Sequence, residues 1–296
     1  MITRLISANS SELLKMNGDE LKQSIKASEG RTVLSENVVI QPAIDGLTMS
    51  EIAAAFGADL ILLNLFDVFE PKVSGLEVKD AKDTVKRLKE LTGRPIGVNL
   101  EPVDPDAKME SIKFELPKGR IATAESMRRA EELGFNFVCF TGNPGSGVTN
   151  KMIVQAVRTA KENFSGMIIA GKMHGAGVDE PVADEESVKA MIDAGADVIL
   201  VPAVGTVPGF TSDELIKIVK IVHQHDGLVM STIGTSQESS GKDVIREIAL
   251  KNNVDIQHIG DAAWGVLPPT ETIFELSKTI RGLNHTISRM ARSINR

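Results

Sequence analysis

Three side chains that can transfer protons or hold a carbonyl group follow two apolar segments of this 296-residue sequence. Glu101 ends the segment 96–101, and Lys172 and His174 end the segment 169–174. Apolar residues in both segments alternate with small or polar ones, as in strands whose successive side chains point to opposite faces. The two segments are therefore predicted to be strands that deliver these three groups to one site.

The same alternation assigns a face to each residue. In the first segment it puts Asn99 and Glu101 on the face that carries the chemistry. In the second it puts Ile169 and Met173 on the side of the covering helices and Lys172 on the side of Glu101. Lys172 and His174 are thus predicted to converge near Glu101.

A lysine in this setting has two chemical uses and one structural use. A desolvated Lys172 can lose its proton and attack a carbonyl, or stay charged and hold an anion or enolate. It can also only neutralise Glu101 as an internal ion pair. His174 precedes the glycine-rich stretch 175–180 and is predicted to act as a general acid or base, with positioning of that loop as the alternative.

Asp45 is a further catalytic candidate, and it follows the apolar residues of a predicted first strand. Together with Glu101, and with Asp67 after the second strand, it could bind Mg²⁺, which takes a few carboxylate ligands and keeps several waters. The alternative is helix capping, the usual work of an aspartate just before a helix. Mg²⁺ is accordingly the cofactor that these residues suggest.

Small and hydroxyl-bearing residues end the last two predicted strands and suit phosphate binding through backbone amides. The glycine-rich stretch 141–147 lacks the lysine of a P-loop and the spacing of a dinucleotide fold. The predicted substrate-binding residues are Asn64, Asn99, Thr141, Asn143, Thr206, Thr232, Gly234, Thr235, Ser236, Gly260 and Asp261.

A repeated pattern indicates the helices and strands that position these residues. In it, a glycine and, two residues later, an aspartate or asparagine precede an apolar run. It occurs at 57–59, 134–136 and 195–197. Glycine closes a helix in the left-handed conformation, and a short apolar run suits a parallel strand covered on both faces. The pattern therefore predicts repeated strand and helix units.

Eight such units follow from the apolar and helical periodicities and from capping boxes such as 48–51 and 211–214. The predicted strands are 38–44, 60–66, 95–101, 137–142, 167–173, 198–204, 228–233 and 255–260. The predicted helices are 49–57, 79–92, 123–133, 149–163, 184–194, 212–225, 241–252 and 270–292. Eight units favour a closed α/β (βα)8 TIM barrel over an open doubly wound sheet, and place the site at the strand carboxyl ends.

The chain is predicted to be one domain of residues 1–296, with an N-terminal helical extension at 1–36 and the barrel at 37–296. A helix within 10–30 offers Leu13, Leu14, Leu21 and Ile25 for burial against the amino-terminal face of the barrel. The long C-terminal helix ends in a basic segment suited to its own dipole or to an oligomer contact; its arginines are Arg281, Arg289, Arg292 and Arg296.

Composition limits the partners. A net charge of −7 argues against nucleic acid or an anionic membrane, so a small metabolite and other copies of the chain in a homo-oligomer are expected. No signal peptide or run of about 20 apolar residues is present, which predicts a cytoplasmic protein. The single Cys139 permits no internal disulfide.

The motifs 57–59, 94–99, 195–197 and 260–261 resemble the phosphate-binding superfamily of TIM-barrel enzymes and, more loosely, the BtpA and SgcQ group of predicted barrel proteins. This resemblance covers residues 37–265 and implies a small-molecule enzyme acting on a sugar phosphate or nucleoside-like compound. The Lys-Cys-Gly-His stretch of phosphoenolpyruvate mutase relatives is absent.

The first functional hypothesis is a lyase or isomerase acting on a small anionic, phosphorylated metabolite. Lys172 would stabilise or capture its carbonyl group, while Glu101 and His174 transfer protons. The alternatives are a metal-assisted hydrolase of a phosphoester or nucleoside-like substrate, using Asp45 and Glu101, and a non-catalytic metabolite-binding barrel.

Overall fold

A closed barrel of eight parallel strands forms the centre of the computed structural model, which describes residues 2–41, 44–234, 237–260 and 270–296. The strands pair in sequence order, and β8 closes the ring against β1. They are β1 (Thr32–Val38), β2 (Leu60–Asn64), β3 (Ile96–Leu100), β4 (Phe137–Phe140), β5 (Met167–Gly171), β6 (Val198–Pro202), β7 (Leu228–Ile233) and β8 (Ile256–Ile259). The predicted TIM barrel is confirmed.

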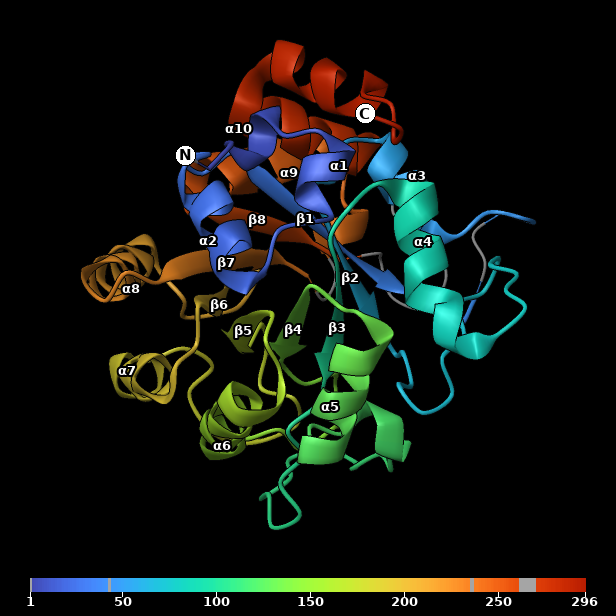
Figure 1. Ribbon diagram of the computed structural model, residues 1–296. Helices are drawn as coiled ribbons and strands as arrows, with labels where there is room; N and C mark the ends of the chain where they lie inside the picture. Colours follow the sequence, from blue (N-terminus) through green and yellow to red (C-terminus); the bar gives the residue numbers. More distant parts are fainter. Residues whose placement is uncertain (1, 42–43, 235–236, 261–269) are drawn as a thin grey trace.

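Helices surround this ring, as Figure 1 shows. The covering helices are α3 (Met49–Ala55), α4 (Thr84–Thr92), α5 (Ala124–Leu133), α6 (Asn150–Asn163), α7 (Glu185–Ala194), α8 (Ser212–Gln224), α9 (Lys242–Lys251) and α10 (Thr270–Ala291). Short 3-10 turns lie at η1 (Leu5–Ser7), η2 (Ala81–Asp83), η3 (Lys118–Arg120) and η4 (Gln237–Ser239). No helix among the described residues is long and apolar enough to span a bilayer.

The first strand lies about six residues earlier than predicted. Its polar residues interrupt the apolar run by which a buried strand is recognised in a sequence. β1 spans Thr32–Val38, whereas the prediction chose the apolar stretch 38–44. Every residue of β1 is buried, including Ser35 and Glu36. This strand therefore begins inside the segment that the prediction assigned to the N-terminal extension.

Two apolar clusters fill the fold. The outer cluster lies between strands and helices and includes Val98, Ile168 and Ala170. The inner cluster fills the barrel axis with residues such as Leu34 and Leu62. Since alternate residues of a strand enter different clusters, membership of a cluster shows which face each strand residue occupies.

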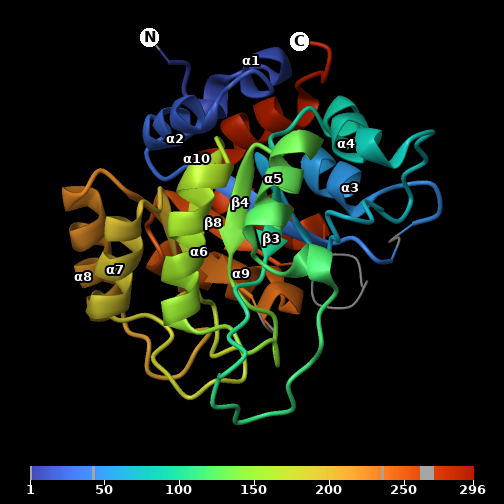
Figure 2. The same ribbon diagram turned by 60° about the horizontal axis from the view of Figure 1, so that its bottom comes forward.

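The N-terminal segment plugs the amino-terminal end of the barrel. The predicted single helix is two helices, α1 (Ser10–Leu13) and α2 (Gly18–Lys26), separated by a turn. Leu13, Leu21 and Ile25 are buried in the inner cluster as predicted. Figure 2 shows α1 and α2 at one end of the barrel and the long connections at the other, which leaves the carboxyl ends of the strands for a site.

The last residue of the repeated helix-to-strand pattern forms a hydrogen bond to the neighbouring strand. The residue before each even-numbered strand accepts a hydrogen bond from the first backbone N–H groups of the preceding strand, at 2.8–3.1 Å. The acceptors are Asp59, Asn136, Asp197 and Asp255, and the donors are Val33, Ile96, Ile168 and Val229. The pattern thus fixes the register of neighbouring strands at their amino ends.

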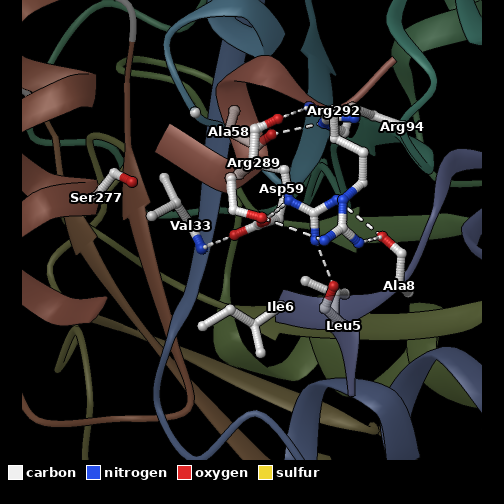
Figure 3. A network of polar contacts seen from close by, with 12 residues as sticks. Leu5, Ile6, Ala8, Val33, Ala58, Asp59, Arg94, Ser277, Arg289 and Arg292 are labelled. Atoms are coloured by element: carbon white, nitrogen blue, oxygen red, sulfur yellow. Dashed lines mark hydrogen bonds and ion pairs between the residues drawn. The ribbon is translucent and has the colours of Figure 1, made fainter. Parts of the chain in front are cut away.

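Asp59 carries a second role, which Figure 3 shows. Its fully buried carboxylate forms ion pairs with Arg281 at 2.6 Å and Arg289 at 2.7 Å. Arg289 also donates to the carbonyl groups of Leu5 and Ala8. One carboxylate therefore joins β1, β2, α10 and the N-terminal segment.

The C-terminal arginines work inside the chain, which corrects the expected dipole or oligomer contact. Arg281 and Arg289 bind Asp59, and Arg292 donates to the carbonyl groups of Ser7 and Ala8. Gly282, at φ 77°, kinks α10 between the two arginines that reach Asp59. These arginines therefore no longer support the predicted homo-oligomer, which stays a prediction.

Asp59→Asn should destabilise the fold strongly, because it leaves two buried guanidinium groups without their counter-charge. We expect a loss of about 3–5 kcal/mol in the free energy of unfolding, measured by urea denaturation. Asp197→Asn is the matched control, since Asp197 occupies the same position but faces only Lys22, at 3.4 Å and partly exposed. Its loss should be about 1–2 kcal/mol. Equal losses in both variants would contradict the proposed role of the arginine pair.

Candidate functional site

Polar side chains occupy the inner face where the strands reach their carboxyl ends. Thr232 on β7 is in register with His258 on β8, and both share the face of inner-cluster residues. Glu36 follows Leu34 by two residues on β1, and Asn64 follows Leu62 by two on β2. Alternation therefore delivers these four polar groups to the same end of the barrel axis.

Glu36 and His258 form the central pair of this site. The Nε2 atom of the buried His258 lies 2.7 Å from Oε2 of Glu36, whose side chain is 8% exposed. Nδ1 of His258 is buried and has no partner among the described residues. A carboxylate that holds the proton on Nε2 leaves Nδ1 as a basic nitrogen, the arrangement used in general base catalysis.

Asn64 connects the pair to the rest of the site. Its Nδ2 donates to Oε1 of Glu36 at 2.5 Å and to Oδ1 of Asn143 at 2.9 Å. Its Oδ1 accepts from Asn99 at 3.2 Å and from the backbone N–H of Leu65 at 2.8 Å. Leu65 has φ 60°, a conformation that costs energy in a non-glycine residue and marks many functional sites.

Glu101 points to this end of the barrel as predicted, but it does not meet Lys172. Oε1 of Glu101 accepts from Arg120 at 2.6 Å, and Oε2 accepts from the backbone N–H of Asn143 at 2.9 Å. Through Asn143, Glu101 joins the network of Asn64. Lys172 therefore does not converge on Glu101 as predicted, and the alternative of an internal ion pair between them is not formed.

The face assignment on β5 is reversed. Ile169 belongs to the inner cluster and Met173 packs against it, whereas Ala170 belongs to the outer cluster. Residues 167–171 are apolar or small throughout, so their own pattern does not reveal which side is the barrel axis. The prediction took its orientation from Lys172, and that choice inverted the strand.

The buried Lys172 has a partly exposed carboxylate partner, Glu180. Its ammonium group donates to Oε1 of Glu180, and that oxygen also accepts from the backbone N–H of Asn150 at the start of α6 at 2.6 Å. Burial lowers the pKa of Lys172, and Glu180 partly offsets the effect. Lys172 thus anchors the β5–α7 connection to the start of α6.

His174 stays close to the site. Its Nδ1 accepts from the backbone N–H of Ala176 at 3.0 Å, so a proton on the neutral ring resides on Nε2. Burial lowers the pKa of His174, the charge of Glu36 raises it, and that of Lys172 lowers it further. The influence of Glu36 places His174 within electrostatic reach of the Glu36–His258 pair.

Glu238 on η4 is a third carboxyl group at this end. A side chain on Gly260, directly after β8, would approach Oε1 of Glu238 to 3.9 Å. Burial raises the pKa of Glu238, which the charges of His258 and Glu36 also influence. Its Oε2 is buried without a partner. Glu238 is therefore a buried carboxyl group near the carboxyl end of β8.

Asp45 and Glu101 do not fit the predicted Mg²⁺ site. Asp45 is exposed in a turn before α3, and both carboxylate oxygens of Glu101 already accept hydrogen bonds. Asp67 accepts from the backbone of Phe69 and Glu70, in keeping with the capping alternative. Within the described ranges no three His, Cys, Asp or Glu side chains gather as a metal-binding group. We therefore derive no step through a metal.

The other predicted binding residues divide into three groups. Thr141, Thr232 and Asn99 are buried with a side-chain oxygen that lacks a partner in the described part of the chain. Thr206 bonds within its own turn, to Ala203. Gly234 and Gly260 lie at the ends of β7 and β8, whereas Thr235, Ser236 and Asp261 lie outside the described residues.

The sequence analysis missed Glu36, His258 and Glu238. Glu36 fell outside the strand because the strand was placed too late. His258 lies in the predicted strand 255–260, and the alternation applied to the third strand would have directed it inward with Ile256. No sequence pattern marked Glu238 as a site residue, because only tertiary packing buries its side chain.

The barrel is similar to several solved enzyme structures. Thiamine phosphate pyrophosphorylase from Pyrococcus furiosus is 15% identical, with a TM-score of 0.48 over 86% of this chain and 100% of that chain. A 2,3-dimethylmalate lyase of the PEP mutase/isocitrate lyase superfamily is 11% identical, with a TM-score of 0.49 over 86% and 82%. Phosphonopyruvate hydrolase, solved with oxalate and Mg²⁺, is 16% identical, with a TM-score of 0.46 over 81% and 80%. At these identities the likeness shows the fold alone.

Sequence comparison gives a family without an activity. No curated protein matches the chain. The resemblance to the BtpA and SgcQ group stays a prediction. One family model, described as a domain of unknown function (DUF7916), matches residues 6–296, and the chain therefore belongs to that family.

Proposed function

We propose that this chain is a barrel enzyme of the lyase or isomerase type, in which His258 transfers a proton at the carboxyl ends of the strands. The observation that carries the proposal is the buried His258, held by Glu36 through Nε2, with no partner for Nδ1 among the described residues. A structural histidine in a barrel interior would bond both nitrogens. A proton acceptor at the strand ends is also what a barrel enzyme requires.

A second proton-transfer group supports the assignment. Lyases and isomerases usually remove a proton at one position and deliver one at another, so they need a base and an acid. Burial raises the pKa of Glu238, which favours its neutral, proton-donating form. His174, with its lowered pKa, is the alternative second group.

The predicted anionic, phosphorylated substrate has less support than the reaction type. Arg120 is paired with Glu101, and Lys172 is paired with Glu180. Lys172 is accordingly assigned a positioning role, through Glu180 and the start of α6, instead of capture of a carbonyl group.

His258→Gln and Glu36→Gln should each lower the rate of substrate proton exchange about 10²–10⁴-fold, because each removes one part of the proposed base. The measurement is exchange of carbon-bound hydrogen in D₂O by NMR, with a panel of aldoses, ketoses and their phosphates. His223→Gln is the control, since His223 is half exposed and pairs with Asp255 outside the site. The proposal fails if His258→Gln exchanges any active compound at the wild-type rate. Binding without exchange would favour the non-catalytic alternative.

Lys172 should not form an imine, because its side chain is fully buried and its ammonium group is bound to Glu180 on the outer face of β5. Borohydride treatment with each carbonyl compound of the panel is expected to leave Lys172 unmodified in peptide mass spectra. Lys172→Met should cost about 1.5–3 kcal/mol of unfolding free energy, the worth of a charged hydrogen bond. Lys189→Met, which removes an exposed ion pair to Glu185, should cost less than about 0.5 kcal/mol. A borohydride adduct on Lys172 would refute the positioning role.

Glu238 should make the protein less stable as the pH rises. The pKa of Glu238 is higher in the folded than in the unfolded chain, so its contribution to stability is complete below the ordinary pKa of a glutamate and is lost as the pH rises through the folded-state pKa. The Tm of the wild type should therefore fall relative to that of Glu238→Gln as the pH increases from 4 to 8. Glu247→Gln should show the opposite trend, because Lys251 lowers the pKa of Glu247. Parallel curves for wild type and Glu238→Gln would contradict this assignment.

A further inference from the structure

Arg120 and Lys172, two cationic side chains that follow the strands at this end of the barrel, are each bound to a protein carboxylate. Arg120 faces Glu101 at 2.6 Å, and Lys172 is bound to Glu180. His258 is held by Glu36, and burial favours the neutral form of His174. The segments 42–43, 235–236 and 261–269 contain no lysine, arginine or histidine in the sequence.

The groups at this end of the barrel that lack partners in the described part of the chain include one donor, Nε of Arg120, and several oxygens, of which the hydroxyl groups both donate and accept. Oδ1 of Asn99 and Oε2 of Glu238 are buried oxygens without a hydrogen bond in the described part of the chain. The hydroxyl groups of Thr141 and Thr232 are also buried and have no hydrogen-bond partner among the described residues. A buried polar atom without a partner costs free energy, so a ligand that supplies the missing partner binds with a corresponding gain.

A phosphate group can accept from the threonine hydroxyls, but it cannot donate to Oδ1 of Asn99. At neutral pH its oxygens accept hydrogen bonds and donate almost none, and its charge would meet the carboxylates of Glu36 and Glu101. Like charges at short range in a poorly hydrated site repel strongly. A hydroxyl group, in contrast, donates to an amide or carboxylate oxygen and accepts from a threonine.

We infer that the site takes a neutral, hydroxyl-rich compound of the sugar or polyol class and discriminates against its phosphorylated form. The inference rests on the proposed location of the site, and it replaces the substrate class that the sequence suggested. The ring of Glu36, Asn64, Asn99, Thr141 and Thr232 presents carboxylate, amide and hydroxyl groups from five strands or strand ends toward the barrel axis. Such a ring can bond several hydroxyl groups of one small ligand at once.

The test uses matched pairs: D-glucose and glucose 6-phosphate, D-ribose and ribose 5-phosphate, and glycerol and glycerol 3-phosphate. Kd values come from isothermal titration calorimetry, with thermal shift as a second readout. At least one neutral compound should bind ten or more times as tightly as its phosphate, and inorganic phosphate should not compete with it. Thr232→Val should weaken that binding about tenfold, the effect of one hydrogen bond.

Thr159→Val is the control, because Thr159 lies on α6 and its hydroxyl bonds only to Gln155 within the helix. It should leave the Kd unchanged. The inference is overturned if a phosphate binds more tightly than its neutral partner, or if every neutral compound has a Kd above about 10 mM. Neutral binding without proton exchange would support this inference and contradict the catalytic proposal. Exchange confined to phosphates would support the catalytic proposal and overturn the inference.

Discussion

The carboxylate of Asp59 is the interaction on which the closed end of the barrel depends. Two arginines of α10 reach it from either side of the kink at Gly282, and neither guanidinium group is exposed. Burying such charges costs free energy unless they are paired and hydrogen-bonded. The backbone carbonyl groups of Gly57, Leu5 and Ala8 complete this pairing, so the two ends of the chain are bound to the start of β2.

This arrangement separates the stabilising and chemical ends of the molecule. At the amino-terminal end, the apolar residues of α1 and α2 fill the barrel axis and the arginines satisfy the buried backbone. At the opposite end, the axis is filled by carboxylate, amide and hydroxyl groups, several of which have no partner in the described part of the chain. Unsatisfied polar groups are tolerable there because the other end supplies the stability.

The inner network also links strands that lie far apart in the sequence. Glu36 receives His258 from β8 and Asn64 from β2, and Asn64 continues through Asn143 to Glu101. A change of charge on Glu36 or Glu101 therefore alters the same set of amide groups. We expect a ligand that bonds to Asn64 to be sensed by both carboxylates, because hydrogen bonds in a buried chain polarise one another.

The sequence by itself determined the architecture, because helix-closing glycines and apolar runs are local signals that recur in each unit. It also placed Glu101 and Asn99 correctly, since β3 alternates between apolar and other residues. It failed on β5, where 167–171 are apolar or small on both faces, and on β1, where Ser35 and Glu36 are polar yet buried. Only the tertiary structure decided that Lys172 meets Glu180 and that Glu36 meets His258. Glu180 lies eight residues after Lys172, and the course of the β5–α7 connection brings the two together. His258 and Glu36 lie on β8 and β1, and closure of the barrel brings them within hydrogen-bonding distance.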